Sequence, residues 1–108
     1  MNNNINSEIK LSTEVISSIA EIAIQELEGV HLPNFFTAKK LLKNNPIETT
    51  LENEEVEITI PIIVDYGVVI PKISPIIQAS IKENIEIMTS LKVSKIHLSV
   101  VGVNANNA

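Results

Sequence analysis

The segment Val56–Tyr66 alternates between apolar and mostly polar residues, and this alternation is the strongest constraint that the sequence places on the fold. Side chains two residues apart point to the same face of a β-strand, so a period of two predicts a strand with one buried face. Pro61 interrupts the pattern, because proline has no N–H to donate to a neighbouring strand. We therefore expect an edge, a bulge or an unpaired side at Pro61. The residues predicted to face the core are Val56, Ile58, Ile60, Ile62, Val64 and Tyr66.

Two longer segments have the three- and four-residue spacing of apolar residues that is typical of amphipathic helices. The first is predicted to begin at Ser12 or Thr13, either of which can cap a helix, and to end at Gly29. The second is predicted to begin at Ser74 and Pro75, since serine caps a helix and proline fits its first position. The predicted apolar stripes are Val15, Ile16, Ile19, Ile22, Ala23 and Leu27 in the first helix and Ile77, Ile81, Ile85 and Met88 in the second.

Shorter elements complete the predicted fold. Ser7–Leu11, Ile47–Leu51 and Val93–Val103 are interpreted as strands, Phe35–Lys43 as a short helix and Val30–Asn34 as a loop. A strand, a helix and a second strand joined at this connection length favour a parallel crossover. We expect an α/β two-layer sandwich in which two main helices cover one face of a small mixed sheet, in the order β-α-β-β-α-β. Residues 7–103 would form this single domain, between disordered tails at residues 1–6 and 104–108.

The composition excludes several classes of protein. A chain of 108 residues with 44% hydrophobic residues can build one core, and the absence of Cys excludes disulfide scaffolds and thiolate metal sites. The net charge is −5 and all eight basic residues are Lys, which argues against nucleic-acid binding because phosphate neutralisation supplies most of that affinity. We see no secretory signal and no apolar stretch of membrane-spanning length, so we expect a cytoplasmic protein.

No catalytic, cofactor-binding or metal-binding residues are predicted. The two histidines, His31 and His97, do not lie in the ligand spacing of a metal site. The three glycines are too far apart for a phosphate-binding loop. The acidic segment 52–57 lacks the spacing of a calcium loop and is interpreted as a solvated hairpin turn.

Two segments are candidates for interaction with a partner. The short helix predicted at 35–43 combines both phenylalanines of the chain with three of its lysines, which fits either a patch that docks on anionic lipid or a partner, or packing of the apolar side chains on the core. If the helices cover only one face of the sheet, the other face is open to self-association or partner docking. The candidate residues are Phe35, Phe36, Lys39, Lys40 and Lys43 in the patch and Ile63, Lys95, His97 and Val101 on the sheet face.

Three segments carry a resemblance to a known family. In 9–30 a short strand leads through Ser and Glu-Val-Ile into a helix that closes on Glu-Gly-Val, and 56–67 is an alternating strand that ends in Tyr-Gly. In 76–103 a Gln within the helix, a Met-Thr-x-Leu turn and a final Val-Gly-Val follow in order. Together these segments resemble the alkaline-shock family of bacterial envelope stress response proteins. Ser90 stands where that family usually has Gly in the turn, so Ser90 has to accept or avoid a left-handed conformation.

The resemblance implies a non-enzymatic cytoplasmic protein that works at or near the inner membrane surface, in cell-envelope homeostasis or in fatty-acid metabolism. It implies no cofactor and supplies no catalytic residue. The expected partners are a second copy of the chain, a membrane-anchored protein or both, with at most peripheral membrane association and no nucleic acid. The alternative is a small RNA-binding or regulatory module, because RNA-binding folds share this order of elements, although the acidic charge and the absence of Arg oppose it.

Overall fold

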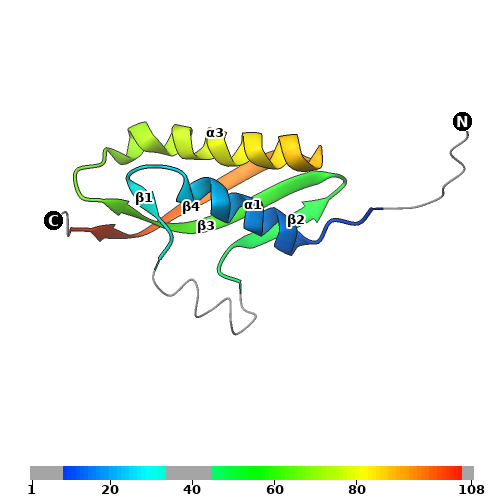
Figure 1. Cartoon of the computed structure of the whole chain (residues 1–108), viewed down its shortest axis with the longest axis horizontal. Helices are drawn as coiled ribbons and strands as arrows, with labels where there is room; N and C mark the ends of the chain where they lie inside the picture. The colour runs from blue at the N-terminus through cyan, green and yellow to red at the C-terminus, as the bar shows by residue number, and fades with distance from the viewer. Residues whose placement is uncertain (1–8, 34–44, 106–108) are drawn as a thin grey trace, which may run out of the picture.

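Two helices pack on one face of a four-stranded mixed sheet (Figure 1). The structure is a computed structural model, and it describes residues 9–33 and 45–105. It confirms the predicted α/β class with two main helices over a small mixed sheet. In chain order the elements are α1 (Thr13–Gln25), β1 (Val30–His31), β2 (Glu48–Glu52), β3 (Glu55–Asp65), α3 (Ile70–Thr89) and β4 (Lys92–Asn104).

The central strand of the sheet is β3. β4 pairs parallel with β3 along the whole of one edge, as the strand–helix–strand connection predicts. β1 and β2 pair antiparallel with β3 and share its other edge, where β2 covers residues 55–59 and β1 covers residues 63–64. Among the described residues, 60–62 therefore have no partner strand on that edge. Pro61 lies in this gap, which explains how a central strand accommodates a proline.

The core lies between the helices and the inner face of the sheet, and it consists almost entirely of isoleucine, valine and alanine. Branched aliphatic side chains of this size each contribute about 1.5–3 kcal/mol when they are fully removed from water. The inner face of β3 matches the predicted alternation up to Val64. The buried members are Ile16, Ile19, Ala20, Ala23, Ile24, Val30, Ile47, Val56, Ile58, Ile60, Ile62, Val64, Ile77, Ile81, Ile85 and Val93.

Four side chains that were predicted to be buried are exposed. Tyr66 lies beyond the last residue of β3 and is 71% exposed, so the alternation ends with the strand. Met88 lies in the last turn of α3 and is also exposed. Val15 and Ile22 are exposed because α1 turns the residues next to them, Ile16 and Ala23, toward the sheet. The predicted helical stripes were therefore correct in period and too wide.

The start of the chain differs from the predicted order. Residues 9–11 of the predicted first strand are not in a strand, and Ile9 is 91% exposed, so no apolar contact favours pairing there. A strand follows α1 instead, where a loop was predicted: Val30 is buried and pairs with Val64. The predicted cap of α1 is confirmed, since the Ser12 hydroxyl accepts a hydrogen bond from the Val15 N–H at 3.3 Å.

α3 begins four residues before the predicted start at Ser74. Val69 is the N-cap, and Pro71 lies in the first turn of the helix. The N–H groups of the first turn have no acceptor within the helix, so a proline there loses no hydrogen bond. Pro75 consequently lies inside the helix rather than at its first position. The Ser74 side chain does not cap the helix, because its hydroxyl donates to the Ile70 carbonyl oxygen at 2.8 Å.

α3 ends at Ser90, which adopts the left-handed conformation that glycine usually provides (φ 61°, ψ 13°). The Ser90 N–H donates to the Glu86 carbonyl oxygen at 2.9 Å, which closes the last turn before β4. Ser90 therefore accepts the left-handed conformation at this turn of the chain.

Replacing Ser90 with Gly is expected to raise the free energy of unfolding by about 1 kcal/mol, because glycine adopts this conformation without steric cost. Urea denaturation followed by circular dichroism measures the change. Ser80→Gly is the matched control: Ser80 lies in the interior of α3, so the same substitution there should lower stability by about 0.5 kcal/mol. A loss of stability in both variants would contradict the strain at Ser90.

Candidate interaction surface

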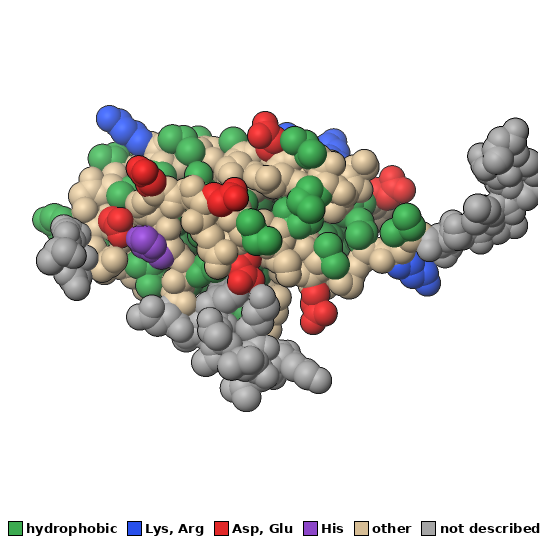
Figure 2. Space-filling model, in the orientation of Figure 1, with side chains coloured by type: hydrophobic (Ala, Val, Ile, Leu, Met, Phe, Trp, Pro, Cys, Tyr) green, Lys and Arg blue, Asp and Glu red, His purple; other side chains and the backbone are tan. Residues whose placement is uncertain are grey.

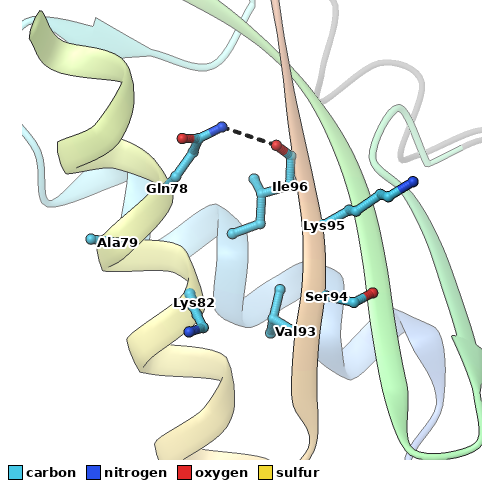
Figure 3. A pocket seen from close by; sticks show the side chains of 7 residues that line it. All are labelled: Gln78, Ala79, Lys82, Val93, Ser94, Lys95 and Ile96. Carbon is cyan, nitrogen blue, oxygen red and sulfur yellow. Dashed lines mark hydrogen bonds between the residues drawn. The ribbon is translucent and has the colours of Figure 1, made fainter.

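A groove runs between α3 and the edge strand β4 (Figure 3). It arises because α3 packs its isoleucine stripe on the sheet and leaves its flank beside β4 uncovered. Its volume is about 330 Å³, and we call it the edge groove. The residues that line it are Gln78, Ala79 and Lys82 of α3 and Val93, Ser94, Lys95 and Ile96 of β4.

Side chains of α3 make hydrogen bonds to the backbone of β4 at the edge groove. Gln78 Nε2 donates to the Ile96 carbonyl oxygen at 3.1 Å, and Figure 3 shows this contact on the side of β4 that faces away from β3. One turn beyond Lys82, the Glu86 carboxylate accepts a hydrogen bond from the Val93 N–H at 2.9 Å. Gln78, Lys82 and Glu86 are spaced four residues apart, so they form one row along the helix.

The edge groove has a positive rim on an acidic protein. Lys82 and Lys95 line it, and Lys92 lines the adjoining hollow next to Ser90 and Leu91. These are three of the five lysines that the structure describes, the others being Lys10 and Lys72. Lys95 Nζ lies 3.8 Å from a Glu57 carboxylate oxygen, but both side chains are well exposed, so this ion pair contributes little to stability. The three lysines of the rim face two carboxylates, Glu57 and Glu86, so the rim keeps an excess of one positive charge on an acidic protein.

The predicted sheet-face residues lie along the strands as follows. Lys95 pairs in register with Glu57, and His97 pairs with Thr59, on the face opposite the buried residues of β3. Ile63 is half-buried and lies opposite Gly102. Val101 is the extra residue at the register shift between Ile62 and Ile63, where β4 bulges. The structure thus brings Ile63, Lys95 and His97 onto one face and places Val101 at the adjoining bulge.

The predicted patch at 35–43 lies outside the described residues, so the positions of Phe35, Phe36, Lys39, Lys40 and Lys43 stay predictions. Figure 2 shows hydrophobic side chains interspersed with acidic groups on the face that carries the helices. The exposed apolar side chains of the helices include Val15 and Ile22 of α1 and Ile76 and Ile87 of α3.

A histidine–carboxylate pair at the other end of the sheet was not predicted. His31 Nε2 of β1 lies 2.8 Å from Asp65 Oδ1 of β3, and the Asn104 amide nitrogen lies 3.4 Å from the same oxygen. These three residues are far apart in the sequence and meet only through strand register. Within residues 9–33 and 45–105, no group of three or more His, Asp and Glu side chains is arranged to hold a metal ion.

The described helices include none that is long and apolar enough to cross a membrane. The fold and its surface define a small mixed α/β domain with a charged groove beside an edge strand of the described sheet. The chain belongs to the alkaline shock protein 23 family, a family of cell envelope-related function, whose family model matches residues 1–105.

Two relatives show the breadth of the similarity. The uncharacterized protein YqhY of Bacillus subtilis is 30% identical over 102 residues, which cover 88% of this chain and 76% of that protein. The uncharacterized protein Spy1535 of Streptococcus pyogenes serotype M6 is 30% identical over 104 residues, which cover 91% of this chain and 80% of that protein. No solved structure matches the chain.

Proposed function

We propose that this protein is a non-enzymatic adaptor of the envelope stress response, which binds a membrane-anchored partner and other copies of itself at the cytoplasmic side of the membrane. The observation that carries the proposal is the edge groove, where lysines concentrate beside the edge strand β4 of a protein with a net charge of −5. The cell envelope-related function of the family supports the place of action.

The chemistry of the groove favours an acidic segment of a partner protein. Lys82 supplies positive charge on the α3 side of the groove, and Lys95 supplies it from β4. The Val93 N–H and the Ile96 carbonyl oxygen are already bonded to Glu86 and Gln78, so the lysine side chains are the groups that attract the segment. The residues of the predicted patch at 35–43 form the second proposed contact, with the membrane surface or with the same partner.

The test is a charge reversal, Lys82→Glu combined with Lys95→Glu, introduced into the native host. We expect the share of the protein that sediments with the envelope fraction to fall about tenfold, because two attractive contacts become repulsive. Lys10→Glu combined with Lys72→Glu is the matched control, since it changes the net charge equally at lysines outside the groove. Circular dichroism checks that both variants fold.

The two double variants separate local recognition from overall charge. If only the Lys82 and Lys95 variant leaves the envelope fraction, the edge groove is the docking site. If both variants leave it equally, the net charge of the protein governs the association and the groove is not the docking site. If neither leaves it, the proposed function of the groove is wrong.

A further inference from the structure

β4 has one edge that no described strand covers. Its thirteen residues pair with β3 on one side only, and the opposite side faces the edge groove and solvent. An unpaired strand edge presents a row of N–H and C=O groups that can pair with another chain, and proteins usually block such edges with charges, short strands or covering groups. The distribution of these devices along the sheet shows which part of the edge is left open.

Most of the sheet edge is protected. On the far side, β2 has only five residues and carries Glu48 and Glu52 at its ends, and β1 has only two residues. On β4, the first half carries Lys92 and Lys95, and α3 occupies two backbone groups: Glu86 accepts from the Val93 N–H, and Gln78 donates to the Ile96 carbonyl oxygen. Charges and side-chain contacts therefore protect the sheet edge up to Ile96.

The second half of β4, Leu98–Val103, carries no charged side chain and is covered by no side chain in the hydrogen bonds of the described residues, and its one irregularity is the bulge at Val101. Backbone groups of alternate residues point to the same edge of a strand, so the groups that follow Ile96 on the open edge are those of Leu98 and Val100. No hydrogen-bond partner for them occurs among the described residues. The segment carries no charged side chain and no proline, and its valines Val100, Val101 and Val103 are 38%, 50% and 55% exposed.

We propose that Leu98–Val103 pairs with the same segment of a second copy, antiparallel about a two-fold axis, so that two sheets join into one. This inference deepens the proposed function, on which it rests, by naming the surface of self-association. A two-fold contact places a segment against its own copy, so like charges in the segment would face and repel one another. Leu98–Val103 contains no charged residue, so this repulsion does not arise. Its valines gain apolar contacts that an acidic partner segment would not provide.

The size of the contact predicts a weak dimer. Pairing over six residues buries less than the roughly 1,200 Å² of a standard stable interface. Two copies that each carry a net charge of −5 also repel each other. The dimer should therefore form mainly where the protein is locally concentrated, as on a shared partner, and it should strengthen when added salt screens the repulsion.

Single cysteines provide a direct test, because the natural chain contains none. We expect Val100→Cys or Val101→Cys to form a disulfide-linked dimer under copper phenanthroline, since residues next to the two-fold axis bring their Cα atoms within disulfide range. Glu48→Cys, at an exposed position on the opposite sheet edge, is the matched control and should remain monomeric. Cross-linking that is equal at Glu48→Cys would overturn the pairing.

A second variant tests the contact without cross-linking. Val100→Lys places a charge next to its own copy at an exposed position, so the fold should persist while dimer affinity in sedimentation equilibrium falls at least tenfold. Unchanged affinity in Val100→Lys, or a protein that stays monomeric up to about 1 mM in high salt, would also overturn the pairing. Neither result affects the adaptor function, which depends separately on the response of the envelope fraction to Lys82→Glu with Lys95→Glu.

Discussion

Replacing Ile81 with alanine is expected to lower the free energy of unfolding by about 2–5 kcal/mol. Ile81 is completely buried in the middle of the α3 stripe, between Ile77 and Ile85, which are also completely buried. Removing three carbons there costs the transfer free energy of the lost groups and leaves a cavity that rigid neighbouring side chains fill only in part. Urea denaturation followed by circular dichroism measures the loss as a lower midpoint at an unchanged slope.

Ile87→Ala is the matched control for this prediction. Ile87 lies in the same helix, is the same residue type and is 74% exposed, so its truncation should change stability by no more than about 0.5 kcal/mol. The comparison cancels the change in helix propensity between isoleucine and alanine, because both positions are helical. Equal losses in the two variants would show that α3 does not face the sheet through Ile81.

Local pattern was enough to predict the elements that carry the core. The alternation from Val56 to Val64 follows from the two-residue period of a strand, and the Ile77–Ile81–Ile85 spacing follows from the helical period. Both patterns depend on neighbours within one element, so the sequence contains them directly. The parallel pairing of β3 with β4 then follows from the length of the helical crossover between them.

The elements that were missed depend on contacts between distant segments. β1 has only two residues, which is too short for any period, and it forms because Val64 and Ile63 offer an edge beside the gap at Pro61. The start of α3 was ambiguous because both Pro71 and Pro75 fit the first turn of a helix. The choice of the earlier start leaves Pro75 within the helix, where it costs one backbone hydrogen bond.

The sequence pointed to only some of the residues at the edge of β4. Lys95 and Val101 were named on the sheet face, whereas the contacts of Gln78 and Glu86 with β4 were not foreseen. The spacing of Gln78, Lys82 and Glu86 at four-residue intervals is visible in the sequence. The sequence does not show that this row of α3 lies against the edge of β4, because that depends on how the helix packs on the sheet. The pair of His31 and Asp65 had no local signal at all, because strand register alone brings them together.

Replacing Gly29 with alanine is expected to lower the free energy of unfolding by about 2 kcal/mol, from two separate causes. Gly29 has φ +84°, which an alanine adopts at a cost of about 1–2 kcal/mol, partly offset because alanine also restricts the unfolded chain. A Cβ at this position would also lie 3.3 Å from Val68 Cγ2. The Gly29 carbonyl oxygen accepts the Asp65 N–H at 2.9 Å, so any shift of this turn loosens the end of β3.

Gly67→Ala separates the two causes. Gly67 has φ +98°, but a Cβ there meets nothing within 4 Å, so only the backbone cost applies, about 1 kcal/mol after the unfolded-state offset. The additional loss in Gly29→Ala then measures the contact with Val68. Combining Gly29→Ala with Val68→Ala removes the contacting methyl group, so the double variant should be more stable than the sum of the two single losses predicts. Strict additivity would show that Val68 yields to the new Cβ without cost, leaving the left-handed backbone as the whole requirement for glycine at this turn.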